Sequence, residues 1–208
     1  MNARSTTPAP LVPARILLVL VVVFGAGCAV RAPVHEPAAE AAWLAHREVL
    51  RTIDEWQVQG RVAVRAGEEG WSAHFDWQQQ GDAYRIRLRG PFGQGAVELR
   101  GDAHGVWMRQ PDRPEVFASD AEALLERETG LRLPVSGLRS WLLGMPVEDI
   151  AADYEWDAQG VLSEIDQSGW HIAYNRYQQS GSLRLPARMR LERDTLQVKF
   201  VIDTWQMS

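Results

Sequence analysis

Three residues of the types used in catalytic triads lie close together at Ser72, His74 and Asp76. They alternate with apolar residues, which predicts that they share the outer face of one strand. Residues two apart on a strand are separated by about 6.6 Å, whereas a nucleophile and its base must approach to about 3 Å. The segment Gly70-Trp71-Ser72-Ala73-His74 also lacks the second glycine of a hydrolase elbow. We therefore predict a solvated strand face and a protein that is not an enzyme.

The other residues that could hold a metal or a nucleotide are isolated. The histidines lie far apart, at positions 35, 46, 74, 104 and 171, and the chain has a single cysteine. No pair of them has the spacing of a zinc site. The only lysine, Lys199, follows Val198 where a phosphate-binding loop needs glycine. We predict no metal and no cofactor.

The cysteine, Cys28, follows a segment typical of a secretory signal. Two arginines precede nine consecutive apolar residues, 16–24, and three small residues, 25–27, come next. The apolar run is shorter than the roughly 20 residues that span a bilayer as a helix. A lone thiol cannot form a disulfide within the chain. The choice is between a lipid-modified cysteine and an ordinary buried or free one.

The sequence around Cys28 favours lipid modification. Ala26-Gly27-Cys28 resembles a bacterial lipobox, in which the cysteine carries the lipid after cleavage, although Gly25 stands where leucine is usual. Ala29 follows, rather than the aspartate that keeps many lipoproteins in the inner membrane, so we predict the outer membrane. We assign residues 1–27 to the signal peptide, 28–37 to a proline-containing tether and 38–208 to the folded domain.

The size and charge of the chain limit its partners. With 208 residues, 46% of them hydrophobic, it can form one domain with a sizeable core. The formal charge is −5, and loss of the two arginines of the signal gives −5 − 2 = −7. Nucleic acid is an improbable partner for such a chain.

Three helices are predicted from periodicity and capping signals. Residues 38–55 place apolar side chains on one helical face, which fits packing over a sheet better than lying on a membrane. Ser119 and Glu122 have the spacing of a capping box before a helix that stops at Gly130. Ser136 is expected to start a short apolar helix, 137–143.

The rest of the chain has the period of two typical of strands. Eleven segments show it: 56–64, 71–77, 84–89, 97–100, 106–110, 115–118, 154–157, 161–167, 170–177, 185–191 and 196–205. So many short one-sided strands predict a mainly β fold of the α+β type, built on a single, strongly curved antiparallel sheet or barrel. The helices are expected to cover its concave apolar side.

The hairpin 84–101 carries an apolar residue that its strand periodicity does not explain. Phe92 lies in the connection 90–95, between turn-forming glycine and proline. It either projects from the loop or folds back onto the core. On the polar face of the same hairpin, Arg85, Arg87 and Arg89 form a row that contacts lipid phosphates or an acidic partner, or is only a solvated face.

Several short motifs resemble the LolB family over about residues 40–205. They are Trp56-x-x-x-Gly60-Arg61, Phe75-x-Trp77, Gly90-Pro91-Phe92-Gly93 before Glu98-Leu99, Leu138-Arg139-x-Trp141-Leu142-x-Gly144-x-Pro146, and Asp203-x-Trp205. The resemblance implies an eleven-stranded incomplete barrel with helices that lid an apolar cavity. It also implies a lipoprotein that faces the periplasm from the outer membrane.

The resemblance further implies a function in transfer. The protein would be a monomer that accepts acylated lipoproteins from the periplasmic carrier LolA and inserts them into the inner leaflet of the outer membrane. The insertion loop would comprise Pro91, Phe92 and Gly93, with Phe92 where the family has leucine. The acyl-binding cavity would comprise Val62, Val64, Phe75, Trp77, Ile86, Leu88, Val97, Leu99, Trp141 and Leu142. The alternatives are a lipid-anchored scaffold of outer-membrane assembly with a filled core, and a tethered hydrolase.

Overall fold

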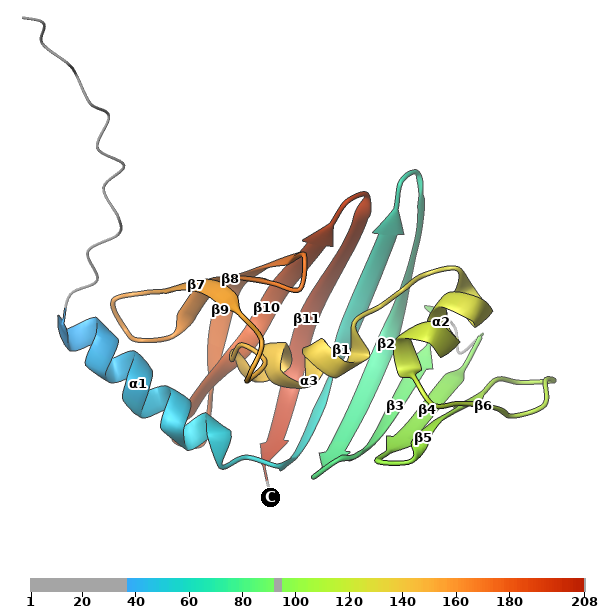
Figure 1. Cartoon of the computed structure of the whole chain (residues 1–208), viewed down its shortest axis with the longest axis horizontal. Helices are drawn as coiled ribbons and strands as arrows, with labels where there is room; N and C mark the ends of the chain where they lie inside the picture. The colour runs from blue at the N-terminus through green and yellow to red at the C-terminus, as the bar shows by residue number, and fades with distance from the viewer. Residues whose placement is uncertain (1–36, 92–94, 208) are drawn as a thin grey trace, which may run out of the picture. The chain divides into compact units, whose positions relative to one another are not determined.

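The computed structural model describes residues 37–91 and 95–207, all within one compact unit. An eleven-stranded antiparallel sheet spans this unit in the order β6-β5-β4-β3-β2-β1-β11-β10-β9-β8-β7 (Figure 1). The strands are β1 Glu55–Ala66, β2 Glu69–Gln80, β3 Ala83–Arg89, β4 Val97–Asp102, β5 Gly105–Arg109, β6 Val116–Ala118, β7 Ala152–Trp156, β8 Leu162–Gln167, β9 Trp170–Ser180, β10 Leu183–Arg193 and β11 Leu196–Met207. The predicted single antiparallel sheet is confirmed, and it is open rather than closed into a barrel.

The alternation of apolar and polar residues that predicted the strands corresponds to alternating buried and exposed side chains in the sheet. On β1, Val58, Val62 and Val64 are buried while the residues between them are mostly exposed. Val62 lies opposite Phe200 of β11 in the antiparallel register. The register shifts beside Gly60, where an added Cβ would collide with the backbone of β11. A glycine is required there because the two strands approach closely at the bulge.

Three helices in the described residues pack on this sheet: α1 Pro37–Arg51, α2 Ala121–Thr129 and α3 Val135–Leu143. In Figure 1, α3 crosses the middle of one sheet face and α2 lies over the side that carries β2–β5. Leu138, Trp141 and Leu142 of α3 are buried against the sheet. The apolar core therefore lies between α2, α3 and the sheet, as predicted.

The first helix packs on the folded domain through tryptophan. Trp43 is almost fully buried, and its ring centroid lies 5.8 Å from that of Tyr154 and 6.3 Å from that of Trp156 on β7. Leu50 is also fully buried. The expectation that this helix packs against the sheet is met, although it ends at Arg51 rather than near residue 55.

Two predicted helix starts differ from the structure. Asp120, not Ser119, caps α2, because its side chain accepts a hydrogen bond from the backbone N–H of Ala123 at 2.6 Å. Glu122, expected to close a capping box, instead binds Ser136. Helix α3 begins at Val135 without a side-chain cap, so Ser136 lies inside its first turn.

Three predicted functional residues fall outside the described residues. They are Cys28 and, in the hairpin connection, Phe92 and Gly93; Pro91 is described and is exposed. In residues 37–91 and 95–207, no helix combines the length and apolar character needed to cross a bilayer.

Candidate functional site

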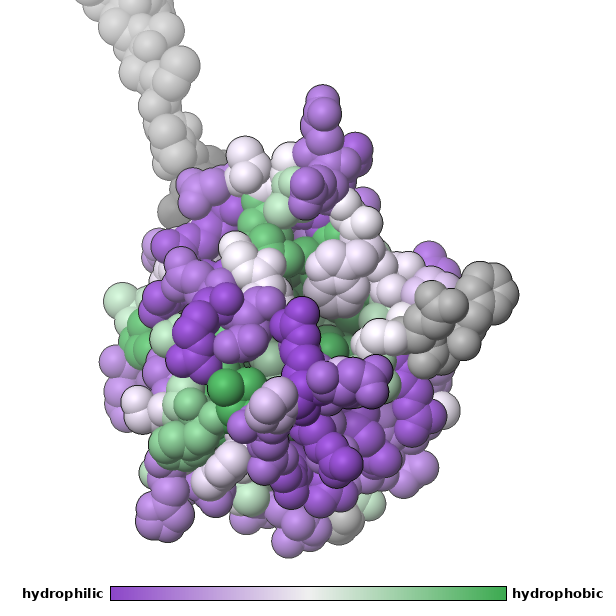
Figure 2. All heavy atoms as spheres, turned by 90° about the vertical axis from the view of Figure 1, so that its right-hand side faces the viewer, coloured by the Kyte–Doolittle hydropathy of each residue, from purple (hydrophilic) through white to green (hydrophobic). Residues whose placement is uncertain are grey.

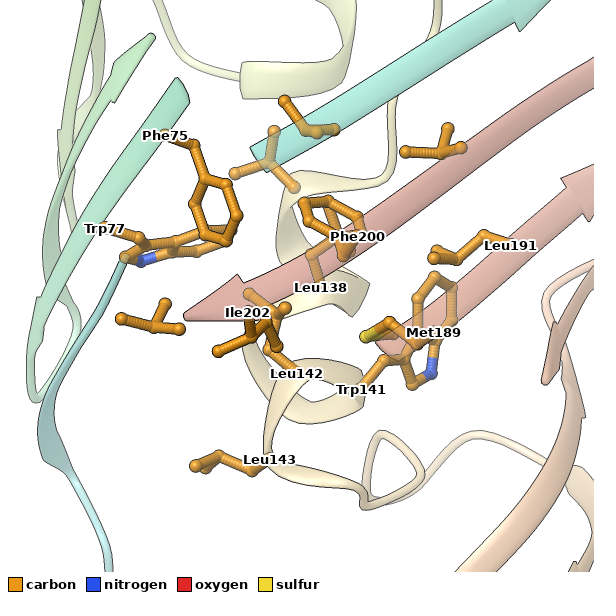
Figure 3. Close-up of a cluster of buried hydrophobic side chains, with 14 of the residues drawn as sticks. Phe75, Trp77, Leu138, Trp141, Leu142, Leu143, Met189, Leu191, Phe200 and Ile202 are labelled. Atoms are coloured by element: carbon orange, nitrogen blue, oxygen red, sulfur yellow. The ribbon is translucent and has the colours of Figure 1, made fainter. Parts of the chain in front are cut away.

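An apolar hollow lies between the sheet and the helices α2 and α3. Its volume is about 60 Å³. Every described residue on its wall is apolar: Val62, Val64, Trp71, Phe75, Trp77, Ile86, Leu88, Leu99, Leu125, Leu133, Pro134, Val135, Leu138, Leu191, Val198 and Phe200. Figure 3 shows Phe75, Phe200 and Leu138 converging from the sheet and from α3.

Most of the predicted cavity residues line this hollow. They are Val62, Val64, Phe75, Trp77, Ile86, Leu88 and Leu99. Val97 is half-buried at the margin of the core, and Trp141 and Leu142 are fully buried beside the hollow rather than on its wall. Their part in ligand binding stays a prediction.

Sequence reasoning did not include the remaining wall residues in the predicted cavity. The walls from β10 and β11 are formed by Leu191, Val198 and Phe200, which occupy buried positions of alternating strands. The helical wall comes from Leu125 of α2 and from Val135 and Leu138 of α3. The periodicity of these elements marks the same residues as inward-facing, but it does not say which inward positions border a void and which are filled.

One wall residue is also on the surface. Trp71 lies near the start of β2 and keeps 41% of its surface exposed although it lines the hollow. Figure 2, which views the molecule from the right-hand side of Figure 1, shows hydrophobic surface inside a recess bordered by hydrophilic side chains. Because Trp71 both lines the hollow and is partly exposed, we infer that the hollow opens toward solvent beside this residue.

Helix α3 is fixed to the sheet by a buried glutamine. Gln167 on β8 is 2% exposed, and its side-chain oxygen accepts hydrogen bonds from the indole N–H of Trp141 at 2.9 Å and from Val147 N–H at 2.8 Å. Its amide group donates to the carbonyl oxygens of Val147 and Ile150, both at 2.9 Å. All the polar atoms of this buried side chain are thus satisfied.

A tyrosine adds a second attachment. The hydroxyl of Tyr174 on β9 donates to the carbonyl oxygen of Trp141 at 2.8 Å. Burial raises the pKa of Tyr174 well above its usual value, so its hydroxyl stays protonated and remains a donor at any physiological pH. Arg139 also binds Asp82 in the turn after β2 at 3.0 Å. Helix α3 is held to the sheet at several points.

Helix α2 is held differently. Its Leu124 and Leu125 are buried, but its hydrogen bonds outside itself, among the described residues, run to Asp120 at its N-cap, to α3 and to the connection between the two helices. Glu122 accepts from the backbone N–H of Ser136 at 2.9 Å and from its hydroxyl at 2.6 Å. Within residues 37–91 and 95–207, the contacts between α2 and the sheet are apolar packing. The part of the helical layer that covers β2–β5, which is α2, is therefore held less firmly to the sheet than α3.

The triad-like residues are not arranged for catalysis. The carboxylate of Asp76 accepts hydrogen bonds from Gln57 at 3.0 Å, Gln59 at 2.7 Å and Arg87 at 3.2 Å. Those bonds stabilise neighbouring strands on the outer face and leave His74 out. In the part of the chain that the structure describes, no group of three metal-ligating side chains comes together.

Comparison with known proteins identifies the family. The family model described as Outer membrane lipoprotein LolB matches residues 54–205. The chain belongs to the LolB family. A relative from Stutzerimonas stutzeri, named Outer-membrane lipoprotein LolB, is 37% identical over 87% of this chain and 89% of its own length. A relative of the same name from Nitrosococcus oceani is 35% identical over 92% of this chain and 96% of its own length.

Solved structures agree with the LolB assignment at the level of the fold. A LolA superfamily protein from Nitrosomonas europaea superposes with a TM-score of 0.52 at 11% identity, over 82% of this chain and 93% of that one. A DUF1329 family protein from Desulfovibrio piger gives 0.53 at 9% identity, over 82% and 92%. The LolB prediction from short motifs is confirmed, and its most specific string, Leu138 to Pro146, covers the last six residues of α3, 138–143, and the turn that follows it.

Proposed function

We propose that this chain accepts the acyl chains of lipoproteins from a LolA-like periplasmic carrier and releases them into the inner leaflet of the outer membrane. Membership of the LolB family makes it a lipoprotein-trafficking protein, and its relatives are named as outer-membrane lipoproteins. The observation that carries the proposal is the apolar hollow under α2 and α3, whose wall includes the partly exposed Trp71. A scaffold with a filled core would have no use for such a hollow.

Acyl binding requires the hollow to widen. Its volume of about 60 Å³ is smaller than the roughly 150 Å³ cavity that admits benzene in an engineered protein. Because α3 is hydrogen-bonded to the sheet and α2 makes no such bond in the part of the chain that the structure describes, we propose that α2 and residues 130–134 move outward. Leu125 and Leu133 would then exchange their contacts with the sheet for contacts with the acyl chain.

The energetics suit a protein that passes its ligand on. Burial of an acyl chain contributes about 0.8 kcal/mol per methylene, and this gain is nearly the same in the carrier, in the receiver and in the bilayer. Transfer can therefore proceed on small differences in affinity without ATP. The chain correspondingly presents apolar wall residues rather than reactive groups at the hollow.

The lipid on Cys28 is proposed to place the protein at the membrane without taking part in transfer, because residues 28–37 separate it from the domain. The mature chain with Cys28→Ala should be recovered in the soluble fraction and should still take up lipoprotein from the carrier. Fractionation followed by a carrier-transfer assay measures both. An unmodified cysteine in the intact mass of the wild-type mature chain would refute the lipid assignment.

The proposed acyl site is tested by a substitution at Trp71, the partly exposed residue of its wall. Trp71→Glu places a carboxylate on an apolar wall, and burial of a polar group there costs about 1–3 kcal/mol. We expect its affinity for an apolar fluorescent probe to fall about tenfold or more. The probe should be displaced from the wild-type protein by a lipopeptide and not by the deacylated peptide.

The matched control is Phe117→Glu. Phe117 is a strand aromatic with 52% of its surface exposed, and it does not line the hollow. This variant should bind the probe like the wild type, and both variants should keep the wild-type melting temperature within a few degrees. Equal loss of probe binding in the two variants, or equal displacement by the acylated and deacylated peptides, would contradict an acyl site in the hollow.

A further inference from the structure

A groove rich in arginine lies where β3 ends, β4 begins and β5 ends, outside the apolar hollow. Its volume is about 640 Å³. Its charged lining consists of four arginines and two acids: Arg87, Arg89, Arg109, Arg113, Glu98 and Asp112. The formal charge of the groove is therefore 4 − 2 = +2, on a chain whose net charge is −5. This end of the sheet is cationic on an otherwise anionic protein.

Three of the arginines have unused hydrogen-bonding capacity. Arg89, Arg109 and Arg113 are exposed and make no ion pair or side-chain hydrogen bond with any residue in 37–91 or 95–207. The arginine row predicted on this hairpin is thus divided, because Arg87 is bound to Asp76 at 3.2 Å. The unpaired guanidinium groups can bind an anion without first breaking an internal salt bridge.

The strand register places these groups on one face. Glu98 of β4 lies opposite Arg87 of β3 on one side and Arg109 of β5 on the other. Neighbouring strands are about 4.8 Å apart, so arginines on β3 and β5 start about 10 Å apart and can converge on one ligand. Glu98 is itself 3.5 Å from Arg100, which lies outside the groove lining and also pairs with Glu115.

The groove also has an apolar side. Leu88 and Val97, the last inward residue of β3 and the first of β4, line it together with the arginines. Both side chains are half-buried, and a cationic rim beside half-buried aliphatic groups matches the boundary of a bilayer, where phosphates lie next to acyl chains. An acidic protein surface would match the arginines but gives no reason for the apolar side.

We propose that this groove binds the phosphate groups of anionic phospholipids such as phosphatidylglycerol. The guanidinium group is suited to the task because its planar fork can bind phosphate oxygens in a bidentate manner. The inference rests on the proposed function, since it supplies the contact that orients the protein during release. The end of β3 and the start of β4 both contribute to the groove lining, through Arg89 and Val97, so phosphate binding would bring these two strand ends to the membrane surface.

The test compares vesicle binding by mature chains that carry Cys28→Ala and therefore lack the lipid anchor. The double variant Arg89→Gln with Arg109→Gln should bind vesicles of phosphatidylethanolamine and phosphatidylglycerol about 25-fold more weakly, at about fivefold for each arginine. Binding to vesicles of phosphatidylethanolamine alone should change much less. Salt should remove the difference, because 1 M salt shortens the screening length to about 3 Å.

A charge-matched control lies on the other half of the sheet. Arg176 on β9 and Arg188 on β10 are exposed, lie opposite each other and have no ion pair among the described residues. Arg176→Gln with Arg188→Gln should keep wild-type vesicle affinity. If both double variants weaken binding equally, only net charge matters and the groove is not a site.

Two further measurements, lipopeptide uptake and acceptance of lipoprotein from the carrier, separate this inference from the proposed function. Lipopeptide uptake should be unaffected in Arg89→Gln with Arg109→Gln. A wild-type protein that takes up no lipopeptide would refute the proposed function, but the vesicle-binding comparison would still test the phosphate site. If this double variant binds anionic vesicles normally but no longer accepts lipoprotein from the carrier, the groove is a protein-docking surface and the lipid assignment is wrong.

Discussion

Delivery of a labelled lipoprotein into liposomes should fall about ten- to hundredfold when Phe92 is replaced by glutamate, while acceptance from the carrier continues. An exposed phenylalanine gains up to about 1.5–3 kcal/mol when it enters apolar surroundings. This is enough to guide a loop tip into a bilayer surface and too little to anchor a protein. A glutamate at this position does not provide that favourable free energy, and it adds the free-energy cost of moving a charge toward the membrane interior.

Two measurements decide how the Phe92→Glu result is interpreted. The melting temperature should match that of the wild type, since a large drop would mean that Phe92 folds back onto the core. Phe92→Leu should restore most of the delivery, because the site is proposed to need bulk and apolarity. A stable glutamate variant that delivers normally would show that this loop is not the insertion device.

The largest loss of stability is expected from Gln167→Leu. The change keeps the side-chain volume but leaves the indole N–H of Trp141 and backbone groups of Val147 and Ile150 without their partner. Each buried polar group left unpaired costs about 1–3 kcal/mol. We expect the free energy of unfolding to fall by about 3–5 kcal/mol and the melting temperature by about 10 °C.

Gln206→Leu is the control for this change. Gln206 lies on β11, is exposed and makes no side-chain hydrogen bond with any residue in the described ranges. It should unfold like the wild type in denaturant titrations. A Gln167→Leu variant as stable as Gln206→Leu would show that water or a local rearrangement replaces the glutamine, and that α3 is not fixed to the sheet through it.

The strands could be predicted from sequence because each buries one face. A period of two, seen at Val62 and Val64 or at Ile86 and Leu88, follows directly from that geometry, and all eleven predicted strands are present. Helix starts were less predictable, because Ser119 and Asp120 are both good caps and only the backbone conformation selects Asp120.

The candidate site was partly predictable for a similar reason. Inward positions of β1–β4 were identified, but Trp141 looks like any other apolar residue of its helix and its position depends on the distant Gln167. The hydrogen bonds of Gln167 join segments 17 to 26 positions apart in sequence. Neither periodicity nor a local motif carries that information.

The central position of β11 bears on how the chain folds. The strand latest in the sequence pairs with β1 on one side and β10 on the other, so it joins the half-sheet β1–β6 to the half-sheet β7–β10. Contacts of such long sequence separation form slowly, because the loop must close before they contribute. Until β11 is in place, β1 and β10 are unpaired edges that can aggregate. Newly exported chains should therefore depend on periplasmic chaperones until synthesis and translocation have reached β11.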